Sequence, residues 1–321
     1  MKQILTKIFI LLLALTAGLS IFPAQSYAAG KINTDHEVKF TVRYLDGTLP
    51  VDGARFELYL AAKTDEYARL TVTEEFSKFP VDYDEMTQEN WQELATTLRS
   101  YVQMTEALAP AASGLTDGNG SLTLSLRPGL YLAIGYRATT DDYNTYSASP
   151  FMVFLPGADA TTGDWVYEVT STPKFTKAYN PSEVEDRYIT RKVILTWDDA
   201  GCESTRPEYE TVMLFRDGEL YDTVLLSESN NWRYSWDNLD PDHEWVIAQV
   251  DPNGYTVKLT DSGITRVIRN KIRPATPTPT PCCCCTKLPQ TGVLWWPVPV
   301  LGALGLVLIV IGISVRRGRD E

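Results

Sequence analysis

An uncharged, mostly apolar run near the C-terminus, at 293–315, constrains this chain more than any other feature. A helix needs about 20 predominantly apolar residues to cross a bilayer, and this run is long enough. Arginines dominate the tail that follows, at 316–321, and cationic flanks of this kind stay on the cytoplasmic side. We therefore predict a transmembrane segment at 293–315 with a basic cytoplasmic tail, so that any folded domain lies upstream.

The N-terminus predicts export. Lys2 and Lys7 precede a short apolar run at 8–21, and Ser26, Ala28 and Ala29 supply the small residues of a cleavage site. The run is too short for a second span and is followed by Pro23, which is typical of a secretory signal peptide. We expect a signal peptide at 1–28 and a mature protein that lies outside the cell.

Five residues precede the apolar run: Leu288, Pro289, Gln290, Thr291 and Gly292. A pentapeptide, a span and a basic tail in this order resemble the LPXTG cell-wall sorting signal of Gram-positive surface proteins. The resemblance implies that a membrane sortase cleaves between Thr291 and Gly292. It also implies that the new threonine carboxyl is transferred to an amine of peptidoglycan. The expected localisation is therefore secreted and cell-wall anchored, with a membrane-bound precursor.

Composition excludes several classes of function. The net charge of −12 argues against nucleic-acid binding, which needs a basic footprint. Only two histidines are present, so imidazole catalysis and multi-histidine metal sites lack material. Phosphate-binding loops and zinc-type Cys/His spacings are absent from the sequence as well. We predict that the protein is not an enzyme and uses no cofactor or metal, a wall-bound enzyme being the remote alternative.

The region at 31–176 is predicted to be a β-sandwich. Apolar and polar residues alternate from Val38 onward, the period-two pattern of half-buried strands. The segment 117–120 has the Asp-Gly and Asn-Gly pairs that favour a hairpin turn. One amphipathic helix, at about 87–104 with Thr87 as its N-cap, interrupts this pattern. We expect this insertion to lie over one edge or end of the sandwich, with its apolar stripe in the core.

A second strand-rich region is predicted at 189–272, after a linker at 177–188. Several short strands at roughly ten-residue spacing, with turn signals between them, indicate a second β-sandwich. Its tryptophans are expected in the core, with Trp232 and Trp236 alternating along one strand. Proline and threonine alternate beyond it, within 273–287. Such a segment favours extended polyproline II, so we predict a stalk.

Four short motifs lie in order along the second region. They are Trp197-Asp198-Asp199, Arg206-Pro207, Asn230-Asn231-Trp232 and Pro252-Asn253-Gly254-Tyr255. Together they resemble the collagen-adhesin (Cna) B-type domain. The first region contains Gly53-Ala54-Arg55-Phe56-Glu57-Leu58-Tyr59, Thr116-Asp117-Gly118-Asn119-Gly120 and Pro128-Gly129-Leu130-Tyr131. Through these segments it resembles, more loosely, the N-terminal domains of sortase-assembled pilins. These resemblances imply an all-β protein of two prealbumin/Ig-like β-sandwich domains that serves as a pilin or stalk module.

Many domains of this family form a lysine–asparagine isopeptide bond beside a buried acid. Alignment on the motifs puts Leu195 at the lysine position and Gln249 at the glutamate position, whereas Asn270 retains the asparagine. Lys192 lies at an odd offset from Leu195, so its side chain should lie on the other face of the strand. The corresponding positions of the first domain are Tyr44 and Gly135. We therefore predict no isopeptide bond in either domain.

A third motif closes the first region. Trp165, Val169, Pro173 and Lys174 reproduce the spacing of the pilin motif, in which the lysine joins one subunit to the threonine of the next. We expect a strand that runs out into the linker here. Ser171 and Thr172 depart from the motif's usual Val and Tyr, so two interpretations stay open. Lys174 is either a polymerisation acceptor, with Lys177 a weaker alternative, or a solvated linker residue beside a core strand.

The cysteines carry no clear assignment. Cys282, Cys283, Cys284 and Cys285 are consecutive, and neighbouring Cα atoms at ~3.8 Å disfavour disulfides between adjacent residues. Inter-chain disulfides, a metal clasp between chains, lipidation and a tolerated repeat in the stalk remain open. Cys202 lies alone in a loop, either free or paired with this run.

The favoured function is a pilin or stalk subunit in adhesion. Its expected partners are a sortase, peptidoglycan and other pilin subunits or further copies of itself. The alternative is a monomeric wall-anchored adhesin that binds a host or cell-surface ligand through its first domain or the helical insertion of that domain.

Overall fold

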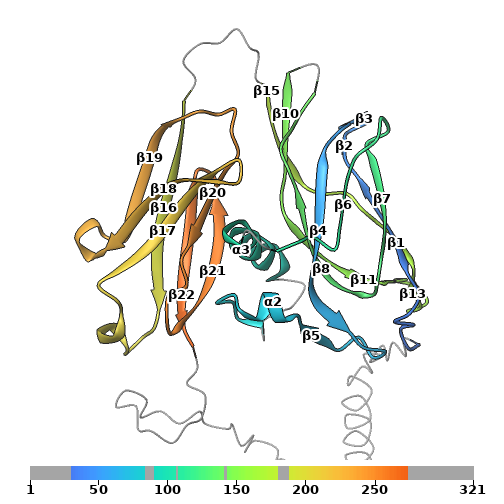
Figure 1. Ribbon diagram of the computed structural model, residues 1–321, viewed down its shortest axis with the longest axis horizontal. Helices are drawn as coiled ribbons and strands as arrows, with labels where there is room; N and C mark the ends of the chain where they lie inside the picture. The colour runs from blue at the N-terminus through green and yellow to red at the C-terminus, as the bar shows by residue number, and fades with distance from the viewer. Residues whose placement is uncertain (1–29, 84–89, 106–107, 141–142, 180–187, 274–321) are drawn as a thin grey trace, which may run out of the picture. The chain divides into compact units, whose positions relative to one another are not determined.

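The computed structural model describes residues 30–83, 90–105, 108–140, 143–179 and 188–273 (Figure 1). Both sandwich regions belong to one compact unit, and the short segment 201–204 is assigned to another. Among these residues, no helix is both long enough and apolar enough to span a membrane. The predicted signal peptide, stalk, sorting pentapeptide, transmembrane segment and tail lie outside the described residues and stay predictions.

The first region folds as a β-sandwich with a helical insertion, as the sequence predicts. Its strands are β1 (Val38–Arg43), β2 (Leu45–Asp46), β3 (Leu49–Pro50), β4 (Arg55–Thr64), β5 (Leu70–Val72), β6 (Ala112–Leu115), β7 (Ser121–Leu126), β8 (Gly129–Gly135), β9 (Ala138–Thr139), β10 (Asn144–Ala148), β11 (Phe151–Leu155), β12 (Gly157–Ala158), β13 (Trp165–Val166), β14 (Glu168–Ser171) and β15 (Phe175–Tyr179). Its helices are α2 (Glu74–Ser77) and α3 (Trp91–Met104). The main sheets have the orders β14-β1-β7 and β11-β8-β4-β5, and β15-β10-β9 forms a third.

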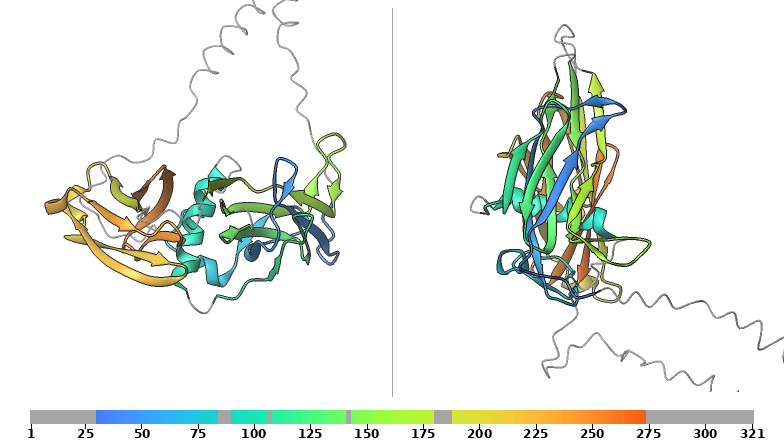
Figure 2. Two further views of the ribbon diagram at one scale, coloured as in Figure 1. Left: turned by 90° about the horizontal axis from the view of Figure 1, so that it is seen from above. Right: turned by 90° about the vertical axis from the view of Figure 1, so that its right-hand side faces the viewer.

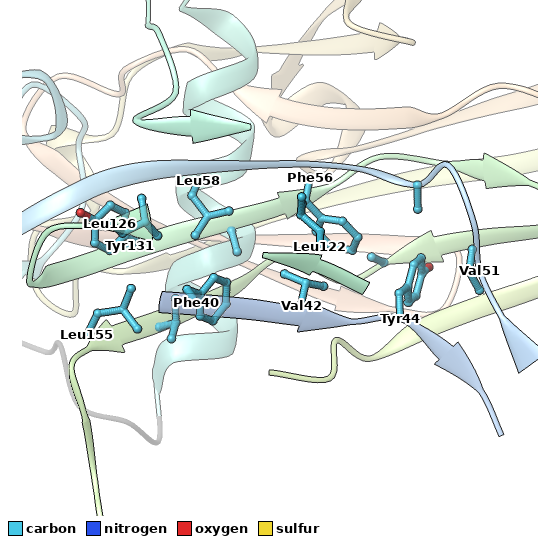
Figure 3. Close-up of a cluster of buried hydrophobic side chains, with 14 of the residues drawn as sticks. Phe40, Val42, Tyr44, Val51, Phe56, Leu58, Leu122, Leu126, Tyr131 and Leu155 are labelled. Atoms are coloured by element: carbon cyan, nitrogen blue, oxygen red, sulfur yellow. The ribbon is translucent and has the colours of Figure 1, made fainter. Parts of the chain in front are cut away.

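The core of the first sandwich lies between its two main sheets. Val38, Phe40 and Val42 alternate along β1 and are fully buried, because every second side chain of a strand points to the same face. They meet Phe56 and Leu58 of β4 in one apolar cluster (Figure 3). The period-two prediction is confirmed for this sheet.

Strand β8 is buried along its whole length, which the alternating pattern does not explain. Tyr131 and Ala133 face the core between the sheets. Leu130, Leu132 and Ile134 face the opposite way and pack in a second cluster with α3. The helix thus adds a third layer to this sandwich, and its apolar stripe is core, as predicted.

The helix differs from the prediction at its start. α3 begins at Trp91, with Asn90 at the N-cap position and no side-chain hydrogen bond from it. The expected cap, Thr87, lies outside the described residues. Leu94, Leu98 and Val102 pack on the first sandwich, whereas Tyr101 belongs to the core of the second.

The second region is a β-sandwich of two sheets (Figure 1). Its strands are β16 (Ile189–Asp198), β17 (Tyr209–Arg216), β18 (Glu219–Ser227), β19 (Arg233–Leu239), β20 (Trp245–Gln249), β21 (Tyr255–Ser262) and β22 (Thr265–Ile272), and its 3-10 turns are η3 (Glu203–Thr205) and η4 (Glu228–Asn230). The sheet orders are β19-β16-β22-β21 and β18-β17-β20, with β16 and β22 parallel. A tight turn at Asp217-Gly218 joins β17 to β18 as an antiparallel hairpin.

The tryptophan pattern was predicted only in part. Trp236 is buried in β19, as expected. Trp232 is not part of that strand, because its φ of 55° and that of Asn231, 53°, place both residues in a left-handed turn before it. The expectation that Trp232 alternates within the strand is therefore wrong, although its side chain still packs against the core.

The insertion also covers the edges of the second sandwich (Figure 2). β21 ends one sheet and β20 ends the other, and such edges leave backbone groups without strand partners. The amide of Leu259 in β21 donates to Thr97 Oγ1 of α3 at 2.9 Å. Ser100 Oγ in turn donates to the carbonyl of Ile247 in β20 at 3.1 Å. A helix inserted in one sandwich thereby satisfies edge groups of the other.

Candidate functional site

The positions aligned with the isopeptide residues lie in the core of the second sandwich. β16 and β22 run side by side, with Leu195 opposite Ile268 and Trp197 opposite Asn270. Leu195 is 3% exposed, and Asn270 and Gln249 are fully buried. Lys192 is exposed, as expected for the other face of β16. Leucine carries no amine, so these residues supply no nucleophile for a bond to Asn270.

The two amides are unusual for buried groups. Neither side chain of Gln249 and Asn270 has a hydrogen-bond partner among the described residues. Buried polar groups are normally paired, and an unpaired one costs about 1–3 kcal/mol. Burying these two amides therefore costs the folded chain stability, which the interaction of Gln249 with Glu210 offsets in part.

A buried acid, Glu210, lies beside Gln249, and sequence reasoning did not find it. Glu210 of β17 is 6% exposed, and its Oε1 lacks a hydrogen-bond partner among the described residues. Burial raises the pKa of Glu210 to about 7, with the Gln249 amide acting in the opposite direction. One sequence signal could have indicated the burial of Glu210. It lies two residues before Val212, so both side chains are on the core-facing side of the strand.

Glu210 makes the stability of the chain depend on pH. Its pKa is about 7 in the folded state and ~4.3 when unfolded, so the folded state binds the proton more tightly. The free energy of unfolding therefore falls as pH rises from about 4.3 to 7. We expect Glu210→Gln to raise this free energy by about 2 kcal/mol at pH 8 and to change it little at pH 4. Urea unfolding at both pH values measures the effect.

The matched control is the exposed neighbour Glu208, whose replacement by Gln should leave the pH dependence unchanged. An unaltered pH slope in Glu210→Gln would contradict the assignment of this dependence to Glu210.

The corresponding positions of the first sandwich also lack an amine. Tyr44 is fully buried, and burial raises the pKa of its hydroxyl. Gly135 has no room for a side chain, since an added Cβ would lie 2.5 Å from Phe56 and 2.7 Å from Ala148. The absence of an isopeptide bond in both domains stays a prediction, and these environments agree with it.

The pilin-like motif occupies the end of the first sandwich. β14 runs parallel to β1, with Val169 opposite Phe40, and the indole Nε1 of Trp165 donates to the carbonyl of Gly30. Pro173 is buried, whereas Lys174 is exposed. The prediction that this strand runs out into the linker is wrong, because β15 begins directly after Lys174 and pairs with β10.

Lys174 therefore lies in a short connection between two strands of different sheets. Its backbone carbonyl accepts a hydrogen bond from the amide of Ser149 at 2.8 Å, so the main chain is held in place. Lys177, the alternative acceptor, is bound differently: its Nζ lies 2.7 Å from Asp46 Oδ2. That contact raises the pKa of the Lys177 amine and favours its charged form.

The sequence motifs of the second region converge in space. Arg206 makes two hydrogen bonds to the buried carboxylate of Asp199, at 2.7 and 2.8 Å, and lowers the pKa of that carboxyl. Its guanidinium lies over the ring of Trp197 at 5.6 Å. Trp232 and Tyr255 each contact Trp197, with ring centroids 5.0 Å apart. Motifs far apart in sequence thus form one cluster at the end of the core.

The residues of this cluster lie in the region that matches a known protein family. Residues 191–271 match the Cna protein B-type domain. The resemblance inferred from the sequence is thereby confirmed over this region. Within the matched region of this chain, the Trp197 cluster is built from the same residues that carry the resemblance, which gives them a packing role.

One curated relative is the collagen adhesin of Staphylococcus aureus, 30% identical over 123 residues, or 36% of this chain. The match covers 10% of that relative's length, so the chain spans about a tenth of it.

Several solved structures are similar as well. A single B repeat unit of the collagen binding surface protein of S. aureus is 15% identical, covering 74% of this chain and 99% of that one, with a TM-score of 0.25. The shaft pilin spaA of Lactobacillus rhamnosus GG is 16% identical, covering 75% and 99%, with a TM-score of 0.25. The major pilin SpaD of Corynebacterium diphtheriae is 13% identical, covering 75% and 65%, with a TM-score of 0.29.

The remaining sequence predictions lie mostly beyond the described residues. The pentapeptide at 288–292 and the cysteines at 282–285 are among them. Cys202 is half-buried. No group of three or more metal-ligating side chains occurs within the part of the chain that the structure describes.

Proposed function

We propose that this chain is a sortase-anchored cell-surface protein that acts as a pilin or stalk subunit in adhesion. The observation that carries the proposal is the order of its parts. A Cna B-type domain is followed by a proline-rich segment, Leu288-Pro289-Gln290-Thr291-Gly292 and an apolar run. In the proposed reaction, sortase breaks the Thr291–Gly292 amide and holds the threonine as an acyl-enzyme. An amine of peptidoglycan then attacks, forming a new amide and releasing the enzyme.

Lys174 is the proposed acceptor when the attacking amine belongs to another subunit. An amine must be accessible and neutral to attack an acyl-enzyme. The Lys174 side chain is exposed and forms no ion pair with any described residue, while its backbone is held by Ser149. Lys177 is held as an ammonium by Asp46, which makes it the poorer nucleophile. These contacts support Lys174 over Lys177.

Anchoring is tested by Thr291→Ala. We expect this variant to be lost from the material that peptidoglycan hydrolase releases from the wall and to accumulate in the membrane fraction and the medium, because sortase cannot form its acyl-enzyme. Immunoblots of the three fractions measure the distribution. Thr286→Ala, outside the pentapeptide, is the control and should remain in the wall. Retention of Thr291→Ala in the wall would contradict sortase anchoring through Thr291.

A further inference from the structure

A cleft of about 520 Å³ lies within the compact unit that contains both sandwiches. Strands β10 and β15 form one wall through residues such as Ser147, Thr176 and Ala178. Helix α3 contributes Arg99, and β16 contributes Arg191. The volume falls within the range of ligand-binding pockets, about 300–1,000 Å³.

The cleft gathers cations on a chain whose net charge is −12. Most of them already have carboxylate partners among the described residues. Arg99 pairs with Glu244, Arg137 with Asp242 at 3.3 Å, Lys177 with Asp46 at 2.7 Å and Arg266 with Asp261 at 2.6 Å. The cations of the cleft therefore bind carboxylates, and most of these carboxylates belong to the same chain.

Arg191 is the exception. It is half-buried, and its guanidinium makes a single hydrogen bond, of 3.5 Å, to the carbonyl of Thr190, with no ion pair to any described residue. Burial lowers the pKa of the Arg191 guanidinium, and the carboxylate of Asp261, which is paired with Arg266, acts in the opposite direction. The Arg191 guanidinium therefore keeps N–H donors for an anion in the cleft.

Strand β15 offers backbone groups at the same place. It ends the sheet β15-β10-β9, so one of its edges has no strand partner among the described residues. Thr176, Lys177 and Ala178 are consecutive in β15 and all line the cleft. An extended peptide can add to such an edge through main-chain hydrogen bonds, with side chains giving specificity.

We propose that this cleft binds an extended acidic peptide segment, which adds to the edge of β15 and places a carboxylate on Arg191. The inference does not depend on sortase anchoring. Charge complementarity selects an acidic peptide, and the free strand edge selects an extended one. An Arg–carboxylate pair in a partly desolvated site is a strong, directional contact.

The test uses the full chain in a mild non-ionic detergent and a fluorescent peptide of three Val-Glu repeats. Fluorescence anisotropy should show saturable binding with a Kd below about 1 mM. Arg191→Gln should weaken this binding at least tenfold, because loss of one partner leaves the other charge unpaired. Arg127→Gln removes the same charge at an exposed site outside the cleft and should leave the Kd unchanged. Thermal melts of both variants check that they fold.

Two further peptides separate the contributions. Three Val-Gln repeats should bind at least tenfold more weakly if the carboxylate is required. Val-Glu repeats with N-methylated valines should also bind more weakly, because strand addition uses peptide N–H groups. An equal loss of peptide affinity in Arg191→Gln and Arg127→Gln would overturn the proposal, and so would the absence of saturable binding. Binding of a heparin hexasaccharide that depends on Arg191, without peptide binding, would overturn it in favour of an acidic saccharide.

Discussion

Leu195→Lys combined with Gln249→Glu is expected to cross-link the second sandwich covalently to Asn270. The new lysine would lie on the β16 face that already packs into the core, two residues from the position opposite Asn270. The new glutamate would replace a fully buried amide. A buried acid favours the neutral amine and moves protons during its attack, so a bond forms between the introduced lysine Nζ and Asn270 Cγ, and ammonia leaves.

The expected effect is large because the cross-link joins two distant parts of the chain. The chain-entropy model gives about 4 kcal/mol for closing a loop of this length. That corresponds to an increase in melting temperature of roughly 10 °C or more for a domain of this size. Intact-mass spectrometry should show the loss of one ammonia, and differential scanning calorimetry should show the higher melting temperature.

The control for this design adds Asn270→Ala to the two substitutions, which removes the electrophile. That triple variant should show no loss of ammonia and should be less stable than the unaltered chain, since an unpaired lysine and glutamate remain buried. If the double variant keeps its full mass, then these three positions do not have the geometry that the family resemblance implies.

Tyr101→Ala is expected to destabilise the second sandwich, although Tyr101 belongs to the insertion of the first. Its ring is 3% exposed, packs in the second core and stacks on Phe79 with centroids 5.5 Å apart. Truncating a buried aromatic residue costs about 3–5 kcal/mol through lost burial and the cavity left behind. Thr97 and Ser100, its neighbours in α3, satisfy the edges of β21 and β20.

Calorimetry of the full chain measures this coupling. We expect a single unfolding transition in the unaltered chain and an earlier, separate transition for the second sandwich in Tyr101→Ala. Tyr101→Phe is the matched control, because the Tyr101 hydroxyl is buried without a partner among the described residues. Its removal should therefore change the free energy of unfolding by less than about 1 kcal/mol. Equal stability of the Ala and Phe variants would contradict a packing role for the ring.

The parts of the fold that could be predicted are those encoded locally. The strand β1 could be predicted from the alternation of apolar and polar residues, because one of its faces meets the core and the other meets solvent. The turn at 117–120 was readable because its residues make the turn themselves: Asp117 Oδ1 accepts from the amides of Asn119 and Ser121, at 2.9 and 2.8 Å. Gly120 adopts a φ of 68° there, next to the carbonyl of Tyr44.

The parts that could not be predicted depend on distant elements. Tyr101 shares a helical stripe with Leu98 and Val102, and periodicity alone gives no sign that it enters a different core. β15 forms because its backbone pairs with the edge of β10. The residues around Lys174 do not indicate this pairing, because β10 is distant in the sequence. Trp232 has the apolar character of a strand residue, yet the chain turns left-handed at that point. Glu210 shares the core-facing side of β17 with Val212, but a glutamate is ordinarily exposed, so its burial became evident only in the fold.

Covalent assembly through Lys174 is tested most directly on cell-wall material released by peptidoglycan hydrolase. The samples are boiled in SDS with reductant and immunoblotted from cells that carry the unaltered chain, Lys174→Ala or Lys177→Ala. A high-mass ladder that survives reductant, persists in Lys177→Ala and disappears in Lys174→Ala is the expected result. A ladder lost on reduction alone would point to the cysteines at 282–285 instead. A single band near monomer mass in all three would contradict the pilin-shaft account and leave a singly anchored adhesin.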